Sequence, residues 1–329
     1  MSSRAFKKTE TLEFTYEKTG EPIRFPVATI SGEREGPTLV VLGGMHGSEF
    51  CGIQSAIELF RTIRPRSLRG TLIVGTIYNM PAFSNHSGFV VPEDNLNPMS
   101  TFPGRLDGSY GETMAWHFDK HVLSKADYFV ELHGGDIPEA LSPFVVALQT
   151  GQTEVDAHMK AMAMAYNVPL VIHRSVKAEA ALGAAYRKTA LRGVPSILAE
   201  AGQQGILAAE GTGIHLAGLR NVMISLGMLD GIVIDTAKRI HLESHGGLRS
   251  TRAGMWYPLV RLNQIVAKDE IVGTIRGYFG ELIEELRSPI DGLVNVVRTS
   301  PSVGYGSVLI ELHKLAEQNQ AEDNSHDGK

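Results

Sequence analysis

The sequence has few of the features that would place a protein outside the cytoplasm or on a nucleic acid. Its only cysteine, Cys51, excludes an internal disulfide framework. Residues 1–14, MSSRAFKKTETLEF, contain no apolar stretch long enough for a signal peptide or a membrane helix. The formal charge of −5 lacks the basic excess that nucleic-acid binding requires. We therefore expect a cytoplasmic protein with no nucleic-acid or membrane partner.

The composition and the hydrophobic periodicity predict an α/β protein. A chain of 329 residues with 43% hydrophobic and 20% charged residues can bury a large core. Short apolar runs alternate with segments of helical spacing over the first 230 or so residues, which is typical of a mostly parallel mixed sheet flanked by helices. The expected strands are 38–44, 70–79, 127–135, 169–174 and 195–202, and the expected helices are 52–63, 111–126, 154–168 and 215–229.

The pattern changes near residue 235. Residues 235–316 form short β-rich runs separated by Gly, Pro and Asp-Gly signals, without a segment of helical spacing. We therefore predict a large α/β domain over residues 1–234 and a smaller all-β domain over residues 235–316. Residues 317–329 are polar and are predicted to be a disordered tail.

A histidine and a glutamate stand close together at the end of the first predicted strand, in GGMHGSEFCG. If the turn leads directly into the next helix, His46 and Glu49 occupy positions i and i+3 and can converge on one point. Two His and one Glu are a standard ligand set for catalytic zinc, and His133, at the end of the strand FVELH, is the expected third ligand. Glu200 lies at a third strand end, and ligands of such sheets bind beyond the carboxyl ends of strands.

Two further observations bear on this site. Glu131 lies two residues before His133, on the same face of the strand, from which it can orient a ligand. His117 and His121 are a rival pair at i and i+4, but no glutamate stands between them where a zinc-protease helix would carry one. We therefore interpret them as ordinary helix residues.

Several motifs together resemble a known family. The segments GGMHGSEFCG, NMPAF, FPG, ADYFVELHGG and GVPSILAEAG resemble, in order and spacing, the succinylglutamate desuccinylase and aspartoacylase family, which shares the zinc carboxypeptidase fold. The resemblance covers most of the chain and implies one zinc ion bound by His46, Glu49 and His133. It also implies that Glu200 is the general base and that the β-rich C-terminal part is barrel-like. Acyl-diaminobutyrate deacylases of ectoine breakdown are more similar in layout than aspartoacylase.

The chemistry implied is hydrolysis of the amide bond of a small N-acyl amino acid. Zinc polarises the amide oxygen and acidifies a water molecule, and Glu200 accepts the proton of that water and passes it to the leaving amine. The expected partner is thus a small-molecule N-acyl amino acid, and a homo-oligomer is compatible with the sequence.

The sequence departs from the family pattern at the substrate. The family carries one arginine after N-x-P-A-F and an Asn-Arg pair before F-P-G, whereas this chain reads NHSGFVVPEDNLNPMSTFPGR, with Asn97 as the surviving residue of the pair. Arg105 and His86 are the remaining candidates for substrate contacts. An acylated diamino acid would tolerate the missing positive charge, and we expect its cation near Glu93 and Asp94.

Two alternatives stay open. One is a zinc carboxypeptidase that acts on peptides, and the other is a metal-binding homologue whose catalysis is weak or absent because the arginines are missing. Glu200 favours an enzyme, since a protein that only binds needs no general base. A β domain beside the cleft favours a small substrate.

Overall fold

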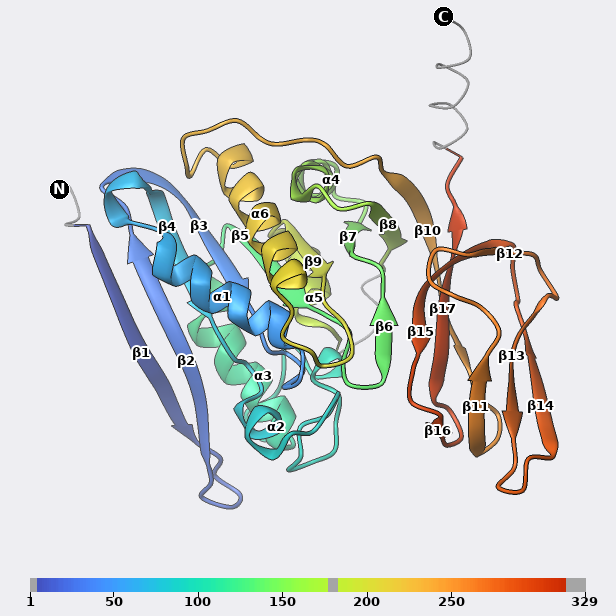
Figure 1. Cartoon of the computed structure of the whole chain (residues 1–329). Coiled ribbons are helices and arrows are strands. Elements are labelled where there is room, and N and C mark those ends of the chain that lie inside the picture. The colour runs from blue at the N-terminus through green and yellow to red at the C-terminus, as the bar shows by residue number, and fades with distance from the viewer. Residues whose placement is uncertain (1–4, 177–182, 318–329) are drawn as a thin grey trace, which may run out of the picture.

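One long sheet runs through the molecule, and a smaller sheet lies at its C-terminal end (Figure 1). The computed structural model describes residues 5–176 and 183–317. Within these residues the large sheet has 13 strands in the order β1-β2-β4-β3-β5-β9-β7-β8-β10-β17-β15-β12, with β6 paired to β15. The small sheet has the order β14-β13-β11-β16.

The strands of the large sheet are β1 (Phe6–Thr15), β2 (Pro22–Ser31), β3 (Arg34–Leu42), β4 (Arg69–Gly75), β5 (Tyr128–His133), β6 (Glu139–Leu141), β7 (Phe144–Gln149), β8 (Leu170–Ser175), β9 (Ser196–Glu200), β10 (Ile240–Arg249), β12 (Ile265–Val266), β15 (Gly292–Arg298) and β17 (Val308–Leu315). Those of the small sheet are β11 (Gly254–Pro258), β13 (Ile271–Arg276), β14 (Leu282–Arg287) and β16 (Ser302–Val303). The helices are α1 (Phe50–Thr62), α2 (Met80–Asn85), α3 (Tyr110–His121), α4 (Thr153–Tyr166), α5 (Ala185–Leu191) and α6 (Ala209–Ser225).

The predicted α/β class is confirmed, and the parallel pairing is confined to the middle of the large sheet. Strands β4, β3, β5 and β9 are mutually parallel, as are β7, β8 and β10, and β7 joins the two groups by antiparallel pairing with β9. Strands β5, β7 and β9 in the middle of the sheet are short and almost wholly buried, as expected where helices cover the sheet, whereas β10 is exposed at alternate positions. Helices α1, α6 and α4 pack side by side on one face (Figure 1).

Four strands of the N-terminal half, β1, β2, β6 and β7, are not predicted from the sequence. Strands β1 and β2 form an antiparallel hairpin at one edge, and β1 is mostly exposed and polar, so its sequence has no clear apolar alternation. Strand β7 lies in a stretch to which the periodicity assigns no element. The predicted helices and the other strands are present, with ends displaced by a few residues.

The C-terminal region is β-rich, as predicted, but it does not stand apart from the large sheet. Strand β10 pairs with β8 in parallel and with β17 in antiparallel register, so the sheet continues past residue 234. A second apolar cluster around Trp256, Val272 and Leu309 packs the small sheet onto β15 and β17. The division into domains at 234 and 235 stays a prediction, and residues 318–329 of the predicted tail lie outside the described residues.

No helix within residues 5–176 and 183–317 combines the length and the apolar character needed to cross a lipid bilayer.

Candidate metal and substrate site

The turn between β3 and α1 carries the first two predicted ligands. Helix α1 begins at Phe50, so Glu49 is the residue that precedes the helix and His46 lies in the turn rather than one helical turn before it. The expected i, i+3 placement along a helix is therefore wrong, although the two side chains do converge. Gly44 adopts a φ of +67°, and a side chain on Gly47 would collide with the backbone of α2 at Ala82 and Phe83. Because the backbone of this turn is tightly packed, the side chains of His46 and Glu49 are directed toward His133 of β5.

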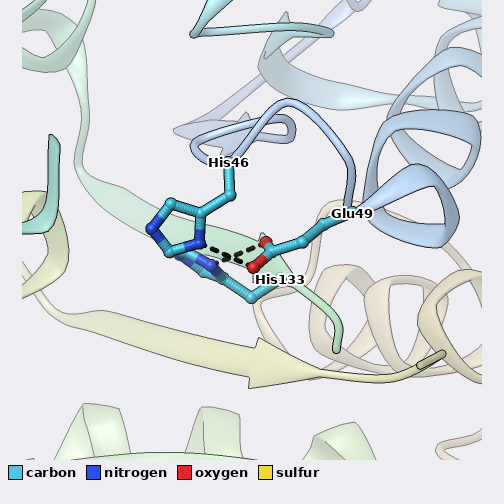
Figure 2. Close-up of side chains that lie close together, drawn as sticks. All are labelled: His46, Glu49 and His133. Carbon is cyan, nitrogen blue, oxygen red and sulfur yellow. Dashed lines mark hydrogen bonds and ion pairs between the residues drawn. The ribbon is translucent and has the colours of Figure 1, made fainter. Parts of the chain in front are cut away.

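His46, Glu49 and His133 form a compact buried cluster (Figure 2). One donor atom from each residue lies within 4.8 Å of the other two, and the three residues are 6%, 3% and 1% exposed. The Nδ1 atom of His46 is 2.6 Å from Oε1 of Glu49, and Nδ1 of His133 is 2.8 Å from Oε2 of the same carboxylate. The second contact lacks hydrogen-bond geometry, so Glu49 Oε2 is a buried oxygen without a partner among the described residues. Such a converging, incompletely satisfied donor set fits a metal ion.

Both imidazole rings are held by their outer nitrogen atoms. His133 Nε2 lies 2.9 Å from Oε1 of Glu131, whose Oε2 accepts the backbone N–H of Tyr186 at 2.8 Å. His46 Nε2 lies 3.2 Å from Oδ1 of Asn97. Because carboxylate and amide oxygens accept, each Nε2 can donate outward, and each Nδ1 faces Glu49, where it can bind a metal once its own proton is lost. Glu131 thus contacts His133 from the same strand, and its role in orienting a metal ligand stays a prediction.

The charges within the cluster are strongly coupled. Burial on its own would raise the pKa of Glu49, but the imidazoles of His46 and His133 lower it to about 2. Burial lowers the pKa of His133, whereas the carboxylates of Glu49 and Glu131 raise it well above its usual value. The carboxylate therefore stays ionised near neutral pH, which is the state that a metal ligand requires.

Glu200 stands next to the cluster at the end of β9. It is paired in register with His133 on the adjacent parallel strand, and it lines a cavity of about 550 Å³ together with His46 and Glu49. Its Oε2 atom is buried without a hydrogen-bond partner among the described residues. Burial raises the pKa of Glu200 well above its usual value, and the nearby His133 partly opposes this. A buried, unpartnered carboxyl group in a cavity is a candidate for proton transfer.

The predicted substrate-contact residues do not gather as expected. Asn97 lines the cavity, but its amide oxygen is already used by His46. Arg105 bonds to the Glu112 carboxylate at 2.9 Å, its side chain is 61% exposed, and it does not line the cavity. His86 is exposed at the C-terminal end of α2. A substrate role for Arg105 and His86 finds no support in this arrangement.

The expected acidic neighbourhood of a substrate cation also lies elsewhere. Asp94 accepts the backbone N–H groups of Gly111 and Leu96, and Glu93 is exposed, so neither residue lines the cavity. The expectation for Glu93 and Asp94 is wrong because this loop is folded against the start of α3. The rival pair His117 and His121 lies on α3, where the two imidazole rings stack on each other and contact the ring of Phe14.

The cavity has charged residues that the sequence did not indicate. Arg187 of α5, Arg249 at the end of β10 and Arg298 at the end of β15 line it, together with Glu139 of β6 and Glu311 of β17. All five come from segments outside the motifs, and their sequence context is ordinary. The pairing of the C-terminal strands with the large sheet brings Arg249, Arg298 and Glu311 to the cavity that His46 and Glu49 also line.

Comparison with known proteins places these features in a family. The model of the succinylglutamate desuccinylase/aspartoacylase catalytic domain matches residues 35–226. The chain is 25% identical over 302 residues to N-alpha-acetyl-L-2,4-diaminobutyric acid deacetylase of Halomonas elongata, covering 90% of this chain and 87% of the relative.

Solved structures share the whole fold. The product-bound ectoine utilization protein EutE (DoeB) from Ruegeria pomeroyi is 25% identical with a TM-score of 0.84, covering 95% of this chain and 97% of its own. A succinylglutamate desuccinylase from Silicibacter sp. TM1040 is 24% identical with a TM-score of 0.82 and covers 95% of both chains. The likeness to the latter is evidence of a common fold.

Proposed function

Because this chain belongs to the succinylglutamate desuccinylase/aspartoacylase family of deacylases, we propose that it is a zinc-dependent hydrolase of the amide bond in a small N-acyl amino acid. The observation that carries the proposal is the shared cavity of the His46, Glu49 and His133 cluster and the unpartnered Glu200 carboxyl group. A metal centre beside a proton acceptor is the arrangement that amide hydrolysis needs.

One zinc ion per chain would be held by Nδ1 of His46, a carboxylate oxygen of Glu49 and Nδ1 of His133. Two imidazoles and one carboxylate suit zinc, and three protein ligands leave a position open, as in catalytic sites. Bound there, zinc would supply Lewis-acid polarisation of the amide carbonyl and would acidify a water molecule.

The residues of the chain supply the proton transfers and the positioning. Glu200 would accept a proton from the attacking water and return it to the nitrogen of the leaving amino acid. Its buried position supports this role. Burial raises the pKa of Glu200, which favours the protonated carboxyl group after it has accepted the proton from water, and that proton can then pass to the leaving amine. Glu131 and Asn97 would keep the two imidazole rings oriented toward the metal.

A small substrate fits this cavity better than a peptide. Strands β10, β15 and β17 contribute Arg249, Val296 and Val308 to the wall of the cavity, so the C-terminal region helps to enclose it. The carboxypeptidase alternative predicts turnover of peptides that have a free C-terminal carboxylate. The alternative of a metal-binding protein without catalysis predicts zinc uptake but no turnover of either class.

The first test measures zinc and turnover together. The zinc-loaded protein should contain about one zinc per chain and should hydrolyse members of a panel of N-acetyl and N-succinyl amino acids. Glu200→Gln keeps the shape but cannot accept the proton, so we expect kcat to fall by about 100-fold or more with zinc content unchanged. As the control, His46→Ala should lose the zinc. Equal turnover in Glu200→Gln would remove this residue from the mechanism, and full zinc in His46→Ala would remove the ligand assignment.

A further inference from the structure

A fully buried histidine of α6, His215, contacts the backbone of β5 at His133. The Nε2 atom of His215 lies 2.8 Å from the carbonyl oxygen of His133, and its Nδ1 atom lies 2.7 Å from the hydroxyl group of Tyr166. His215 is 0% exposed and Tyr166 is 2% exposed. Because a carbonyl oxygen can only accept, Nε2 of His215 carries a proton and donates it to the His133 backbone.

The two strand ends beside His215 carry functional groups of the proposed site. His133 at the end of β5 is paired in register with Glu200 at the end of β9. Just beyond this pair, the N–H of Ala201 donates to the His133 carbonyl at 3.2 Å, so this oxygen accepts from both Ala201 and His215. Burial lowers the pKa of His215 to about 4, and hydrogen bonding to the backbone of His133 and of Ala201 partly opposes this. His215 therefore interacts with the ends of both strands.

The backbone that follows His133 cannot be held in place by side chains. Gly134 and Gly135 come next, and a Cβ atom on Gly134 would lie 2.6 Å from the carbonyl oxygen of Ala201. The close approach of the two strand ends thus requires a glycine, which has no side chain to pack and the greatest backbone freedom. The hydrogen bonds on the His133 carbonyl therefore restrain the end of β5 where packing of the next two residues does not.

The position of His215 is fixed by the two helices α4 and α6. Tyr166 is the last residue of α4, and its hydroxyl group is the partner of His215 Nδ1. Gly218 lies on the next turn of α6, where a Cβ atom would come within 2.5 Å of the Tyr166 ring, so this ring lies directly against the α6 backbone. Figure 1 shows α4 and α6 next to each other on one face of the sheet. The helix pair thus holds the imidazole of His215 in one place relative to the strand ends.

A buried histidine is a costly residue for a helix that only fills the core. A polar ring that leaves water must regain its hydrogen bonds inside the protein, whereas a leucine of similar size has no such requirement. The hydrogen bond of His215 gains a use when the restrained carbonyl belongs to a metal ligand. Residues that orient metal ligands from outside the ligand set change metal affinity or activity by roughly 10–100-fold when they are replaced.

We infer that His215 is a positioning residue that acts through the backbone and holds the metal ligand His133 in place relative to Glu200. This inference rests on the proposed function, since it concerns the metal ligand and the proton-transfer group of that site. His215 does not line the cavity, so it acts on the reaction only through the carbonyl group of His133.

The test uses two amide side chains that retain different atoms of the imidazole ring. The amide group of glutamine reaches the position of Nε2, so His215→Gln can still donate to the His133 carbonyl. The shorter asparagine reaches only the position of Nδ1, so His215→Asn cannot. We expect zinc affinity and kcat to fall by about 10-fold or more in His215→Asn and to stay close to wild type in His215→Gln, with KM little changed in both. Competition with a chromophoric chelator gives the zinc affinity.

Two further variants separate positioning from stability. Val222 is 0% exposed and lies about two turns after His215 on α6, so Val222→Ala weakens the core without removing the hydrogen bond. Thermal unfolding gives the stability of each variant. Losses of zinc affinity and kcat in Val222→Ala as large as those in His215→Asn would overturn the inference. If His215→Asn does not fold, Tyr166→Phe replaces it, since it frees Nδ1 of His215 and should lower zinc affinity and kcat. No change in Tyr166→Phe would then refute the inference.

Hydrogen exchange of the metal-free protein provides a measurement that needs neither zinc nor turnover. The Ala201 amide donates to the same carbonyl as His215, so it should exchange about 5-fold faster or more in His215→Asn than in His215→Gln, because one hydrogen bond at the strand end is lost. The amide of Leu198 in the middle of β9 is the internal control and should exchange alike in both variants.

The outcomes distinguish this inference from the proposed function. If the wild-type protein binds zinc and hydrolyses N-acyl amino acids while His215→Asn and His215→Gln behave alike, the inference is overturned and the proposed function stands. If the wild-type protein binds no zinc and hydrolyses no substrate, the proposed function fails. The exchange of the Ala201 amide then decides the inference: faster exchange in His215→Asn alone supports it, and equal exchange in the two variants refutes it.

Discussion

His133 shows how single side chains determine the chemistry of this site. Its Nε2 is tied to Glu131, which in turn is fixed by the Tyr186 backbone, so only Nδ1 faces Glu49. The imidazole ring of His133 is thus held in one orientation, with Nδ1 toward Glu49. Asn97 holds the ring of His46 in a similar way. Two residues outside the proposed ligand set therefore determine which nitrogen atoms face the proposed metal position.

A second histidine, His313 on β17, makes a prediction about acid stability. It is fully buried, its Nδ1 accepts the backbone N–H of His245 at 3.2 Å, and its Nε2 has no hydrogen bond within the described residues. Burial, with the nearby charges of Arg174 and His245, lowers the pKa of His313 from 6.5 to about 4. Between these pH values the unfolded chain binds a proton at this residue that the folded chain does not. The free energy of unfolding should therefore decrease as pH falls from 6.5 to 4, by about 3 kcal/mol at most from this residue.

The measurement is urea unfolding at several pH values for wild type and His313→Asn. Asparagine keeps an acceptor for the His245 N–H but does not titrate, so the variant should lose less stability over this pH range. His158→Asn on the exposed surface of α4 controls for the loss of one histidine. Parallel pH curves for wild type and His313→Asn would show that His313 does not contribute.

At the scale of elements, the turn of residues 43–49 packs closely against the short helix α2. Gly47 touches the α2 backbone so closely that a Cβ atom would overlap Ala82 and Phe83. Since Asn79, at the start of α2, also accepts the Ala82 N–H, the helix cannot shift freely. The position of both His46 and Glu49 depends on this contact.

Two glycine substitutions should accordingly have opposite effects. Gly47→Ala should destabilise the protein by about 1–3 kcal/mol, as overpacking does, and should weaken zinc binding by displacing the turn. Gly213→Ala, inside α6 with open space around the added methyl group, should stabilise by about 0.5–1 kcal/mol. Thermal unfolding and zinc titration of both variants check this. A neutral Gly47→Ala would mean that the turn is more adaptable than its packing indicates.

At the scale of the whole molecule, the C-terminal strands serve both the sheet and the cavity. Strand β10 covers the edge of β8, and Leu242, Leu293 and Val296 belong to the main apolar core. The same strands carry Arg249, Arg298 and Glu311 to the cavity wall. The stability of the fold and the wall of the cavity therefore depend on the same strands, which cutting the chain near residue 234 would remove together.

A truncation tests this coupling. A chain ending after Ile234 would expose the β8 edge and part of the core, so we expect aggregation or loss of cooperative unfolding. A chain ending after Glu317, which removes no strand or helix of the described residues, is the control and should keep zinc and turnover. Size-exclusion chromatography and thermal unfolding distinguish the cases. A folded, monomeric product of the first truncation would show that residues 1–234 are an independent domain.

The sequence by itself determined the parts of this protein that depend on neighbouring residues. These parts are the succession of strand, turn and helix, the contact of His46 with Glu49 and the contact of Glu131 with His133. Each involves residues within a few positions of one another, where apolar periodicity and side-chain direction can be inferred from the sequence. His133 and Glu200 could be added because the carboxyl ends of parallel strands meet at one edge of a sheet.

Only the tertiary structure decided what faces that site. The antiparallel β7 between β9 and β8, and the return of β15 and β17 to the large sheet, are long-range pairings that no local pattern specifies. They place Arg249, Arg298, Glu139 and Glu311 around the cavity. An isolated arginine or glutamate on a strand has the same sequence signature whether it faces solvent or a ligand, because its role depends on the element packed opposite it.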